Sequence, residues 1–260
     1  MAELITRREG AVGWIIFSNV AKHNAVTHEM WKAVPEALAG FEREDAVRAI
    51  VVAGDGDKAF ISGADISQFE KARASKDAQA EYNRAVEAAY LAPARCAKPV
   101  IAKIRGICFG GGLGVAAACD LRFASDDATF RMPAARLGLG YNFVGMKRFY
   151  DVMGAANTAD MFFSARKFDA AEALHMGFVN RVFPAADFDR EVAAYAALVA
   201  ENAPLTVAAA KRTIAEILKD PQARDLAAVQ AMVARCFASE DYKEGRTAFM
   251  EKRKPVFRGR

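Results

Sequence analysis

The sequence has few residues of the kinds that hold metals or cross-link chains. Only four cysteines, with no CxxC pair, and three histidines occur: Cys96, Cys108, Cys119, Cys236, His23, His28 and His175. The cysteines stand in apolar surroundings, and the histidines in predicted helices, His28 and His175, have no acidic or cysteine partner at ligand spacing. We therefore expect free, buried thiols in a reducing compartment and no metal site.

The chain of 260 residues also lacks strongly charged blocks and long apolar runs. Its net charge is +4 and its one short basic stretch is EKRKP, so it has no basic stripe of the kind that binds nucleic acid. Apolar segments such as GLGVAAACDL are too short to span a bilayer, and the start, MAELITRREGAVG, has no apolar h-region of a signal peptide. We expect a cytoplasmic protein that binds neither nucleic acid nor a membrane, while an anionic small ligand stays compatible with the charge.

What the sequence does have is an alternation of strand-like and helix-like segments. ELITRR and AVGWIIFSN predict two strands joined by a Glu-Gly turn, and Thr27 is the expected N-cap of the helix HEMWKAVPEALAGFERE. RAIVVAG, PVIAKI and DLRFAS predict strands, whereas residues 75–96 and GGLGVAAAC predict helices. From about Phe143 the pattern is helical, with one short strand near GFVNRVF and a break at 202–204. This order predicts an α/β fold with a helical C-terminal portion.

The glycine run FGGGLG at 109–114 invites a functional interpretation. It lacks the Lys-Ser/Thr of a P-loop, and Val115 stands where a dinucleotide fingerprint needs its last glycine. Glycine-rich backbone that enters a helix points free N–H groups outward, where they can stabilise a developing oxyanion. The turn KAFISGADI at 58–66 has a similar character. A structural tight turn is the alternative, and spacing does not show whether the two loops meet.

The segments KAFISGADI and RGICFGGGLGVAAACDLRFAS resemble the paired signatures of the crotonase (enoyl-CoA hydratase/isomerase) superfamily. The resemblance continues through MPAARLGLG, FFSARKFDAAEALHMGFVNRVF, NAPLTVAAAK and DYKEGRTAFMEKRKPVF, nearly the whole chain in the family's order. It implies a spiral of ββα units with a helical C-terminal part, assembled as a homotrimer or homohexamer. On this basis we expect a crotonase-like α/β core over residues 1–200 and a C-terminal helical trimerisation region over residues 201–260.

The resemblance also implies an acyl-CoA substrate, with coenzyme A as part of the thioester and no separate cofactor. The oxyanion hole would consist of the N–H groups of Ala64 and Gly111. The residues implied to contact CoA are Lys22, Asn24 and Ala25 in the first loop, Ala64, Asp65 and Ile66 at the adenine, and Phe249 and Lys252 from the tail, often across a subunit contact. Without the resemblance, Lys22 and Lys252 would be interpreted as solvated surface charges.

Both glutamates that enoyl-CoA hydratases of this family use are missing. Their positions correspond to Gly114 and Ala134, which can neither donate nor accept a side-chain proton. The family places Asp65 and Asp120 in structural positions, so they do not replace the missing acids. We therefore expect ordinary hydration to be impaired.

The segment GLGYNFVG resembles the corresponding part of methylmalonyl-CoA decarboxylase, a family member with a tyrosine at the position of Tyr141. Loss of CO₂ from a malonyl-type thioester needs no base, because the bond cleavage itself leaves the electron pair. It needs an oxyanion hole and a donor that orients the carboxylate, and Tyr141, with Asn142 beside it, would be that donor. A pocket without acids is also drier and repels a substrate carboxylate less. The sequence therefore favours a decarboxylase-like lyase.

Three alternatives stay open. Tyr141 could be a core tyrosine with a satisfied hydroxyl group. The chain could be a hydratase or isomerase with an atypical catalytic residue, or an inactive acyl-CoA-binding protein. The acyl group is not readable from the sequence, because it depends on the variable helix from Ser67 to about Ala94.

Overall fold

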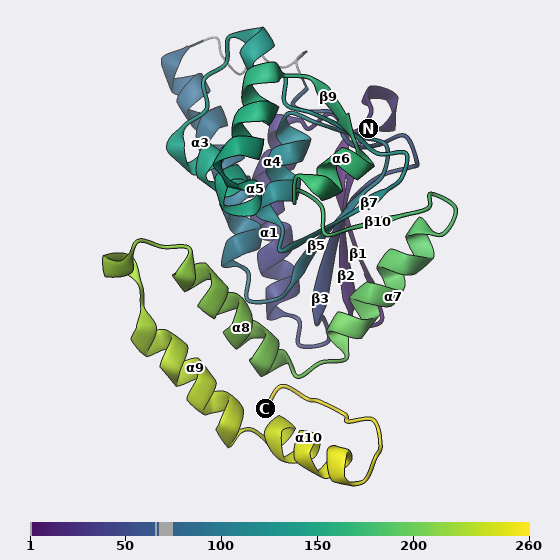
Figure 1. Cartoon of the computed structure of the whole chain (residues 1–260), viewed down its shortest axis with the longest axis vertical. Helices are drawn as coiled ribbons and strands as arrows, with labels where there is room; N and C mark the ends of the chain where they lie inside the picture. The colour runs from purple at the N-terminus through teal and green to yellow at the C-terminus, as the bar shows by residue number, and fades with distance from the viewer. Residues whose placement is uncertain (1, 66, 68–74) are drawn as a thin grey trace.

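The computed structural model describes residues 2–65, 67 and 75–260, whose strands form two sheets (Figure 1). The larger sheet has six strands in the order β1-β2-β3-β5-β7-β10. Their bounds are β1 (Glu3–Glu9), β2 (Val12–Ser18), β3 (Ala49–Gly54), β5 (Val100–Ile104), β7 (Leu121–Ser125) and β10 (Arg181–Phe183). The pair β1 and β2 is antiparallel, as expected for the predicted hairpin, and the other pairs are parallel.

The smaller sheet has four strands in the order β4-β6-β8-β9 among the described residues. Their bounds are β4 (Ala59–Ile61), β6 (Ile107–Phe109), β8 (Thr129–Arg131) and β9 (Lys167–Asp169). Along the chain, β3, β5 and β7 of the larger sheet are each followed by β4, β6 and β8 of the smaller one, and then by a helix. This repeat confirms the predicted α/β fold of ββα units.

The helices cover the sheets and form the C-terminal portion (Figure 1). Their bounds are α1 (His28–Arg43), α3 (Lys76–Arg95), α4 (Gly111–Ala118), α5 (Phe143–Ser164), α6 (Ala170–His175), α7 (Phe188–Ala200), α8 (Pro204–Ile217), α9 (Leu226–Ala238) and α10 (Glu240–Met250). Short 3₁₀ turns are η1 (Val20–Lys22), η3 (Ala134–Leu137) and η4 (Pro221–Ala223). Thr27 caps α1 as predicted, because its side chain accepts a hydrogen bond from the Met30 N–H.

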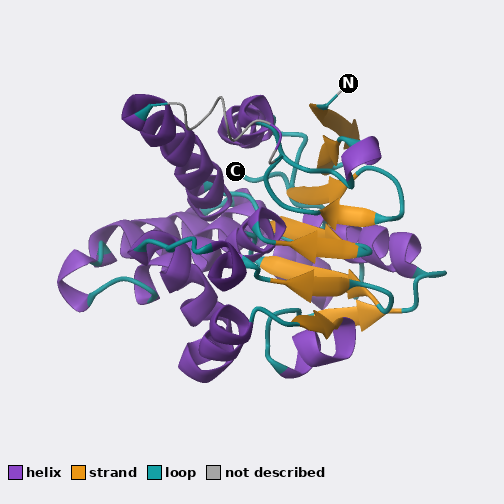
Figure 2. Cartoon of the chain, turned by 90° about the horizontal axis from the view of Figure 1, so that it is seen from above, coloured by secondary structure: helices purple, strands orange, loops and turns teal. Residues whose placement is uncertain are grey.

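Both faces of β3, in the middle of the larger sheet, are buried, which explains why RAIVVAG is continuously apolar. Side chains alternate between the faces of a strand, so Ile50 and Val52 join the cluster that includes α1, α3 and α4. Val51 points to the opposite face and joins Phe188 and Val192 of α7. Figure 2 shows the strands with helices around them from above. The face covered by α3 and α4 carries the candidate site described below.

Helix α4 is apolar and buried, and two arginines donate hydrogen bonds to backbone carbonyl groups at its C-terminal end. The Arg122 guanidinium donates to the Cys119 carbonyl at 2.6 Å, and Arg148 Nε donates to the Ala117 carbonyl at 2.6 Å. A helix leaves its last carbonyls without intrahelical partners, so this end needs such donors when it is buried. The opposite end of α4, which begins at Gly111, is left with free N–H groups.

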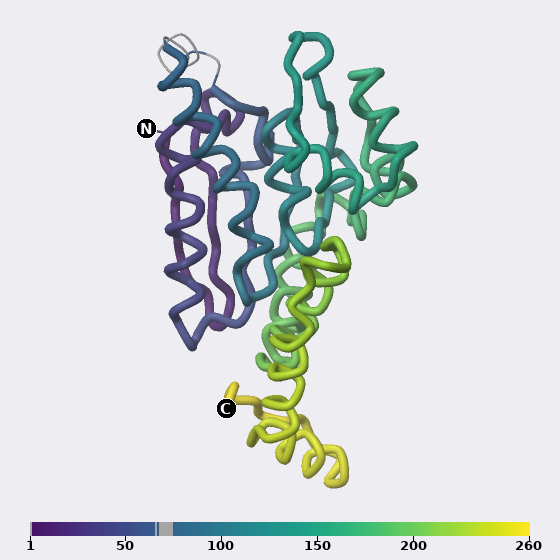
Figure 3. Tube along the Cα trace, turned by 90° about the vertical axis from the view of Figure 1, so that its left-hand side faces the viewer, coloured from purple at the N-terminus to yellow at the C-terminus, as the bar shows by residue number. Residues whose placement is uncertain are grey.

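The C-terminal helices extend away from the sheets, as Figures 1 and 3 show. The predicted break at 202–204 separates α7 from α8, and the short strand expected near GFVNRVF is β10. The prediction of a single short strand after Phe143 was wrong, because β9 also forms there. Its three residues pair antiparallel with β8, with Phe168 stacked on Phe130 at 5.3 Å, so tertiary pairing rather than local propensity makes this strand.

Candidate active site

The two glycine-containing loops singled out in the sequence meet beside a cavity. Strands β4 and β6 are parallel neighbours, so the loops that follow them leave the same edge of the smaller sheet. A Cβ built on Gly110 would lie 3.9 Å from the Gly63 Cα, which places the two turns in contact. Both loops line a cavity of about 350 Å³, to which Ala64 and Gly111 contribute. The structure thus brings together the two residues that the resemblance implied for an oxyanion hole.

The backbone around Ala64 and Gly111 leaves both N–H groups available. Val26 forms a parallel bridge in which its N–H donates to the Gly63 carbonyl at 2.8 Å and its carbonyl accepts from the Asp65 N–H at 2.9 Å. The Ala64 N–H lies outside this bridge and has no partner among the described residues. Gly111 is the first residue of α4, where an N–H has no intrahelical acceptor. Two such donors at one cavity can bind a developing oxyanion.

The resemblance implied an acid at position 114 in related hydratases. In this chain, Tyr90 of α3 fills the space beside Gly114 that such a side chain would need. A Cβ on Gly114 would lie 2.5 Å from the Tyr90 hydroxyl oxygen, and closer still to a ring carbon. Tyr90 therefore occupies the volume that a side chain at position 114 would need. The other position, Ala134, is buried at the start of η3 and lines the same cavity with its methyl group. Neither position supplies a carboxylate.

Three tyrosines, Tyr82, Tyr90 and Tyr141, line the cavity. Tyr82 accepts a hydrogen bond from Trp31 Nε1 at 3.2 Å. Burial raises the pKa of Tyr141 to about 12, and the nearby Tyr82 adds to this effect. Burial also raises the pKa of Tyr90 well above its usual range, with smaller contributions from Tyr141 and Tyr82. Tyr90 and Tyr141 are therefore protonated at neutral pH and can donate a hydrogen bond to a ligand.

Tyr141 and Asn142 both line the cavity, but Tyr141 is fixed by ring packing and Asn142 by a hydrogen bond. The Tyr141 ring packs edge-on against Phe162, with centroids 5.0 Å apart. The Asn142 side-chain oxygen accepts from the Gly145 N–H at 2.9 Å and caps α5. The amide oxygen of Asn142 is thus committed to the helix, whereas the hydroxyl group of Tyr141 has no hydrogen-bond partner among the described residues.

One carboxylate does line the cavity, and the sequence analysis missed it. Glu87 of α3 is the only acidic residue among the described lining residues, and no Lys or Arg of the described chain accompanies it there. Its carboxylate makes no hydrogen bond or ion pair within the part of the chain that the structure describes. The spacing of Tyr82, Val86 and Tyr90 is the signal that could have found it, because residues at i, i+4 and i+8 share one helix face with their neighbours.

The loop that the resemblance implied for CoA binding, residues 22–25, packs directly against the Ala64 turn. Lys22 Nζ donates to an Asp65 carboxylate oxygen at 2.8 Å and to Ser67 Oγ at 2.8 Å. Asn24 is buried, with Nδ2 bonded to the Asp55 and Ala59 carbonyls and Oδ1 to the Asn19 N–H, so its side chain serves the fold. Ala25 beside it is also buried. Ile66 lies outside the described residues.

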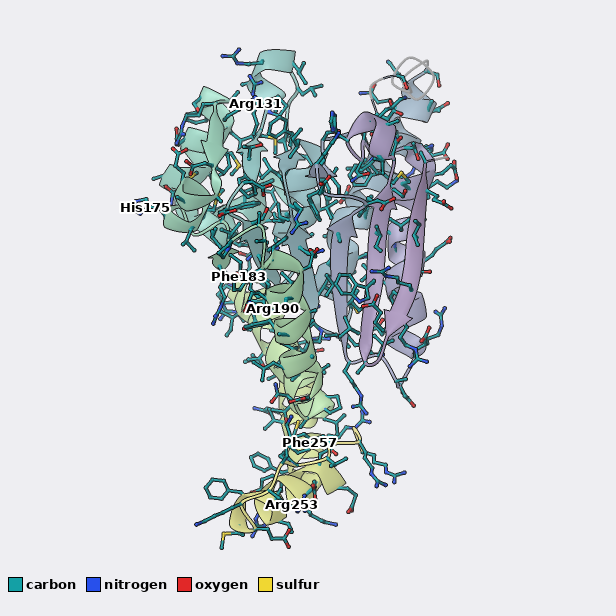
Figure 4. All side chains as sticks on the ribbon, turned by 90° about the vertical axis from the view of Figure 1, so that its right-hand side faces the viewer. Arg131, His175, Phe183, Arg190, Arg253 and Phe257 are labelled. Atoms are coloured by element: carbon teal, nitrogen blue, oxygen red, sulfur yellow. The ribbon has the colours of Figure 1, made fainter. Side chains whose placement is uncertain are left out.

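The two tail residues do not reach this cavity in the same chain. Phe249 is 81% exposed at the end of α10, and Lys252 follows it with a positive φ of 54°. Arg253, the next residue, lies at the opposite end of the molecule from Arg131 (Figure 4). Arg131 belongs to the cavity end, since its carbonyl accepts from the Gly110 N–H at 2.9 Å. Within one chain, the tail therefore lies at the end of the molecule away from this cavity.

The described part of the chain has neither a metal-binding cluster nor a single helix that could span a membrane. Within it, no group of three or more His, Cys, Asp or Glu side chains is arranged to hold a metal ion. No single described helix is both long and apolar enough to cross a membrane. The bent pair α7 and α8 together has the length and the apolar composition of a membrane span, and nothing else in the described residues supports that interpretation.

Comparison with known proteins places these features in one family. The chain matches the profile of the enoyl-CoA hydratase/isomerase family over residues 7–260. It is 30% identical over 251 residues to the short-chain-enoyl-CoA hydratase of Clostridium acetobutylicum, covering 96% of this chain and 95% of that one. It is 33% identical to a probable enoyl-CoA hydratase of Rhizobium meliloti, covering 99% and 98% of the two chains.

The fold comparison agrees with the sequence comparison. The crystal structure of an enoyl-CoA hydratase/carnithine racemase from Magnetospirillum magneticum matches with a TM-score of 0.95 and 32% identity, covering 100% of this chain and 97% of that one. Enzymes of this family act on CoA thioesters without an additional cofactor. From its profile, its relatives and its crotonase fold, the chain belongs to the enoyl-CoA hydratase/isomerase family, the crotonase superfamily.

Proposed function

We propose that this chain is an acyl-CoA lyase that decarboxylates a malonyl-type CoA thioester. The observation that carries the proposal is the cavity itself, which has two backbone N–H groups without an acceptor among the described residues and protonated tyrosines but no carboxylate at positions 114 and 134. Hydration needs side chains that activate water and return a proton. Decarboxylation needs only a site that stabilises the enolate.

In the proposed reaction, the bond between C2 and the carboxylate carbon breaks, and its electron pair moves into the thioester. The Ala64 and Gly111 N–H groups bind the enolate oxygen that develops. The Tyr141 hydroxyl donates a hydrogen bond to the carboxylate before cleavage and fixes its orientation relative to the thioester plane. CO₂ leaves without any base, and C2 of the enolate then takes a proton.

The proposal predicts that the protein releases CO₂ from malonyl-CoA or methylmalonyl-CoA and hydrates crotonyl-CoA poorly. Tyr141→Phe is expected to lower kcat for CO₂ release by about 10²-fold, because the orienting hydrogen bond is lost. Tyr195→Phe, on the far face beside Phe123, is the matched control and should behave as the parent protein. Rapid crotonyl-CoA hydration without CO₂ release would contradict the proposal. Binding of acyl-CoA without any turnover would instead identify an inactive acyl-CoA-binding protein.

A second candidate function follows from Glu87. Moving a double bond from C3 to C2 of an enoyl-CoA requires one base, which removes a proton from C2 and returns it to C4. A carboxylate with no ion-pair partner among the described residues, beside an oxyanion hole, satisfies this need, whereas hydration in this family uses two. We therefore infer that 3-enoyl-CoA isomerisation, with Glu87 as the base, is the alternative to decarboxylation.

The variant Glu87→Gln separates the two candidates because its expected effects have opposite signs. For an isomerase, loss of the base should lower kcat with 3-hexenoyl-CoA by about 10²–10⁴-fold. For a decarboxylase, loss of a negative charge near the substrate carboxylate should lower KM for malonyl-CoA and spare kcat. Glu81→Gln, an exposed position on the same helix, is the control and should change neither rate.

We also propose that residues 201–260 assemble the chain into a homotrimer, or a homohexamer built from two trimers. The support is apolar surface: within the described chain, no side chain of α9 is buried, and Phe237 is 63% exposed. Helices α8, α9 and α10 also enclose an apolar groove of about 900 Å³. Leaving this much apolar surface in water is unfavourable for a monomer.

Sedimentation at micromolar concentration tests the assembly. We expect a mass of about three or six times the 28.2 kDa of one chain. Phe237→Glu should shift the protein toward monomers, because it places a charge in the apolar surface. Phe163→Glu changes a still more exposed phenylalanine on α5, 82% exposed, and should leave the assembly intact. A parent protein that sediments as a monomer would contradict the proposal.

A further inference from the structure

The Tyr90 ring packs against Gly114, and the reaction proposed above gives neither residue a role. The Tyr90 ring lies where any side chain at position 114 would begin, and its hydroxyl oxygen is 2.5 Å from the position of a Gly114 Cβ. The Trp31 ring meets it edge-on, with centroids 5.7 Å apart and planes at 87°. The ring is therefore held in one place by α1 on one side and by α4 on the other.

The hydroxyl group of Tyr90 ends beside the proposed oxyanion donor. It lies 3.5 Å from the Gly111 carbonyl oxygen and 3.6 Å from the position of a Cβ on Gly111. A donor–acceptor separation of 3.5 Å is at the outer limit of a hydrogen bond, so the proton is only weakly engaged. Gly111 thus connects the two groups, since its N–H is the proposed oxyanion donor and its carbonyl lies near the tyrosine hydroxyl.

We propose that Tyr90 replaces the missing acid of α4 and delivers the proton to C2 of the thioester enolate. This inference rests on the proposed enolate chemistry and assigns its last step. After CO₂ has left, the electron pair on C2 forms a bond to the Tyr90 hydroxyl proton. The phenolate that results regains a proton from water at the cavity mouth, so atoms and charges balance without any further reactant.

The arrangement separates two roles between two tyrosines. Tyr141 comes from the segment between η3 and α5 and orients the carboxylate, while Tyr90 comes from α3 and donates to carbon. The carbanion carbon of an enolate is a far stronger base than a phenolate. The transfer is therefore favourable even though Tyr90 holds its proton tightly in the resting enzyme.

The first test is the stereochemistry of decarboxylation in D₂O. The parent protein should convert methylmalonyl-CoA to propionyl-CoA with deuterium in one configuration at C2. Tyr90→Phe keeps the ring that fills the space beside Gly114, so the fold should be retained, but water should then deuterate both faces. Tyr150→Phe, an exposed tyrosine of α5, is the control and should keep one configuration. One configuration from Tyr90→Phe would overturn the assignment.

A second test does not depend on decarboxylation. By microscopic reversibility, the small ionised fraction of Tyr90 can remove a proton from C2, so the parent should exchange the C2 hydrogens of butyryl-CoA in D₂O, and should do so faster as pD rises toward about 10. Tyr90→Phe should slow this exchange by about 10²-fold or more, as measured by NMR. Equal exchange in both proteins at high pD would overturn the role of Tyr90. Absence of CO₂ release with Tyr90-dependent exchange would overturn the decarboxylase proposal alone.

Discussion

Ala64→Pro is expected to lower kcat by about 10²–10³-fold, the usual effect of removing one oxyanion-hole donor. Proline has no N–H, and the Ala64 N–H has no other partner among the described residues, so the substitution removes no hydrogen bond seen in the resting structure. Binding of the CoA portion should change much less than turnover, because the donor acts on charge that develops during the reaction. Steady-state kinetics with the best substrate measures both effects.

The matched control for this prediction is Ala64→Gly, which keeps the N–H and should lose far less activity. Far-UV circular dichroism and urea unfolding establish that each variant is folded before its rate is compared. An Ala64→Pro protein that is folded and turns over at the parental rate would show that the thioester oxygen binds elsewhere.

Gly114→Ala is expected to lower the free energy of unfolding by about 1–3 kcal/mol, although alanine is the better helix former. Its Cβ would lie 2.5 Å from the Tyr90 hydroxyl oxygen, in a position where the ring is already held by Trp31. Either the ring or α4 must shift. Equilibrium urea unfolding, analysed at a constant m-value, measures this cost.

A double-mutant cycle with Tyr90→Ala assigns the cost to this one contact. In the Tyr90→Ala background the ring is gone, so Gly114→Ala should become neutral or stabilising. Gly40→Ala is the control glycine, because it lies inside α1 with no atom within 4 Å of the position that a Cβ would take, and it should stabilise by about 0.5–1 kcal/mol. Equal costs of Gly114→Ala in both backgrounds would refute the proposed fit.

Much of the fold could be predicted because local patterns and tertiary structure agree. The apolar run of β3 is buried on both faces, and Thr27 caps α1, so periodicity and capping chemistry were sufficient there. Strand β9 has only three residues and one buried side chain, Phe168. Nothing in its own sequence distinguishes it from a loop, since it forms only because β8 offers an edge.

The backbone N–H groups of the site could be predicted from the sequence. The side chains that helix packing turns toward the cavity could not. The glycine run predicts the turn at Gly111, and the resemblance pointed to Ala64. Only the parallel pairing of β4 with β6 explains why the two loops meet. Glu87 and Tyr90 were missed because a helical pattern does not say which face turns toward the cavity. That face is fixed by α1 and α4, which are distant in sequence.

The fit between Tyr90 and Gly114 also limits how this chain could change over time. A glutamate at position 114 cannot be accommodated while the ring is present, and removal of the ring alone opens a cavity beside Trp31. Each single step is therefore unfavourable, although the pair of changes together could be tolerated. A carboxylate at position 114 would therefore need a change at position 90 as well, so the two positions can only be altered together.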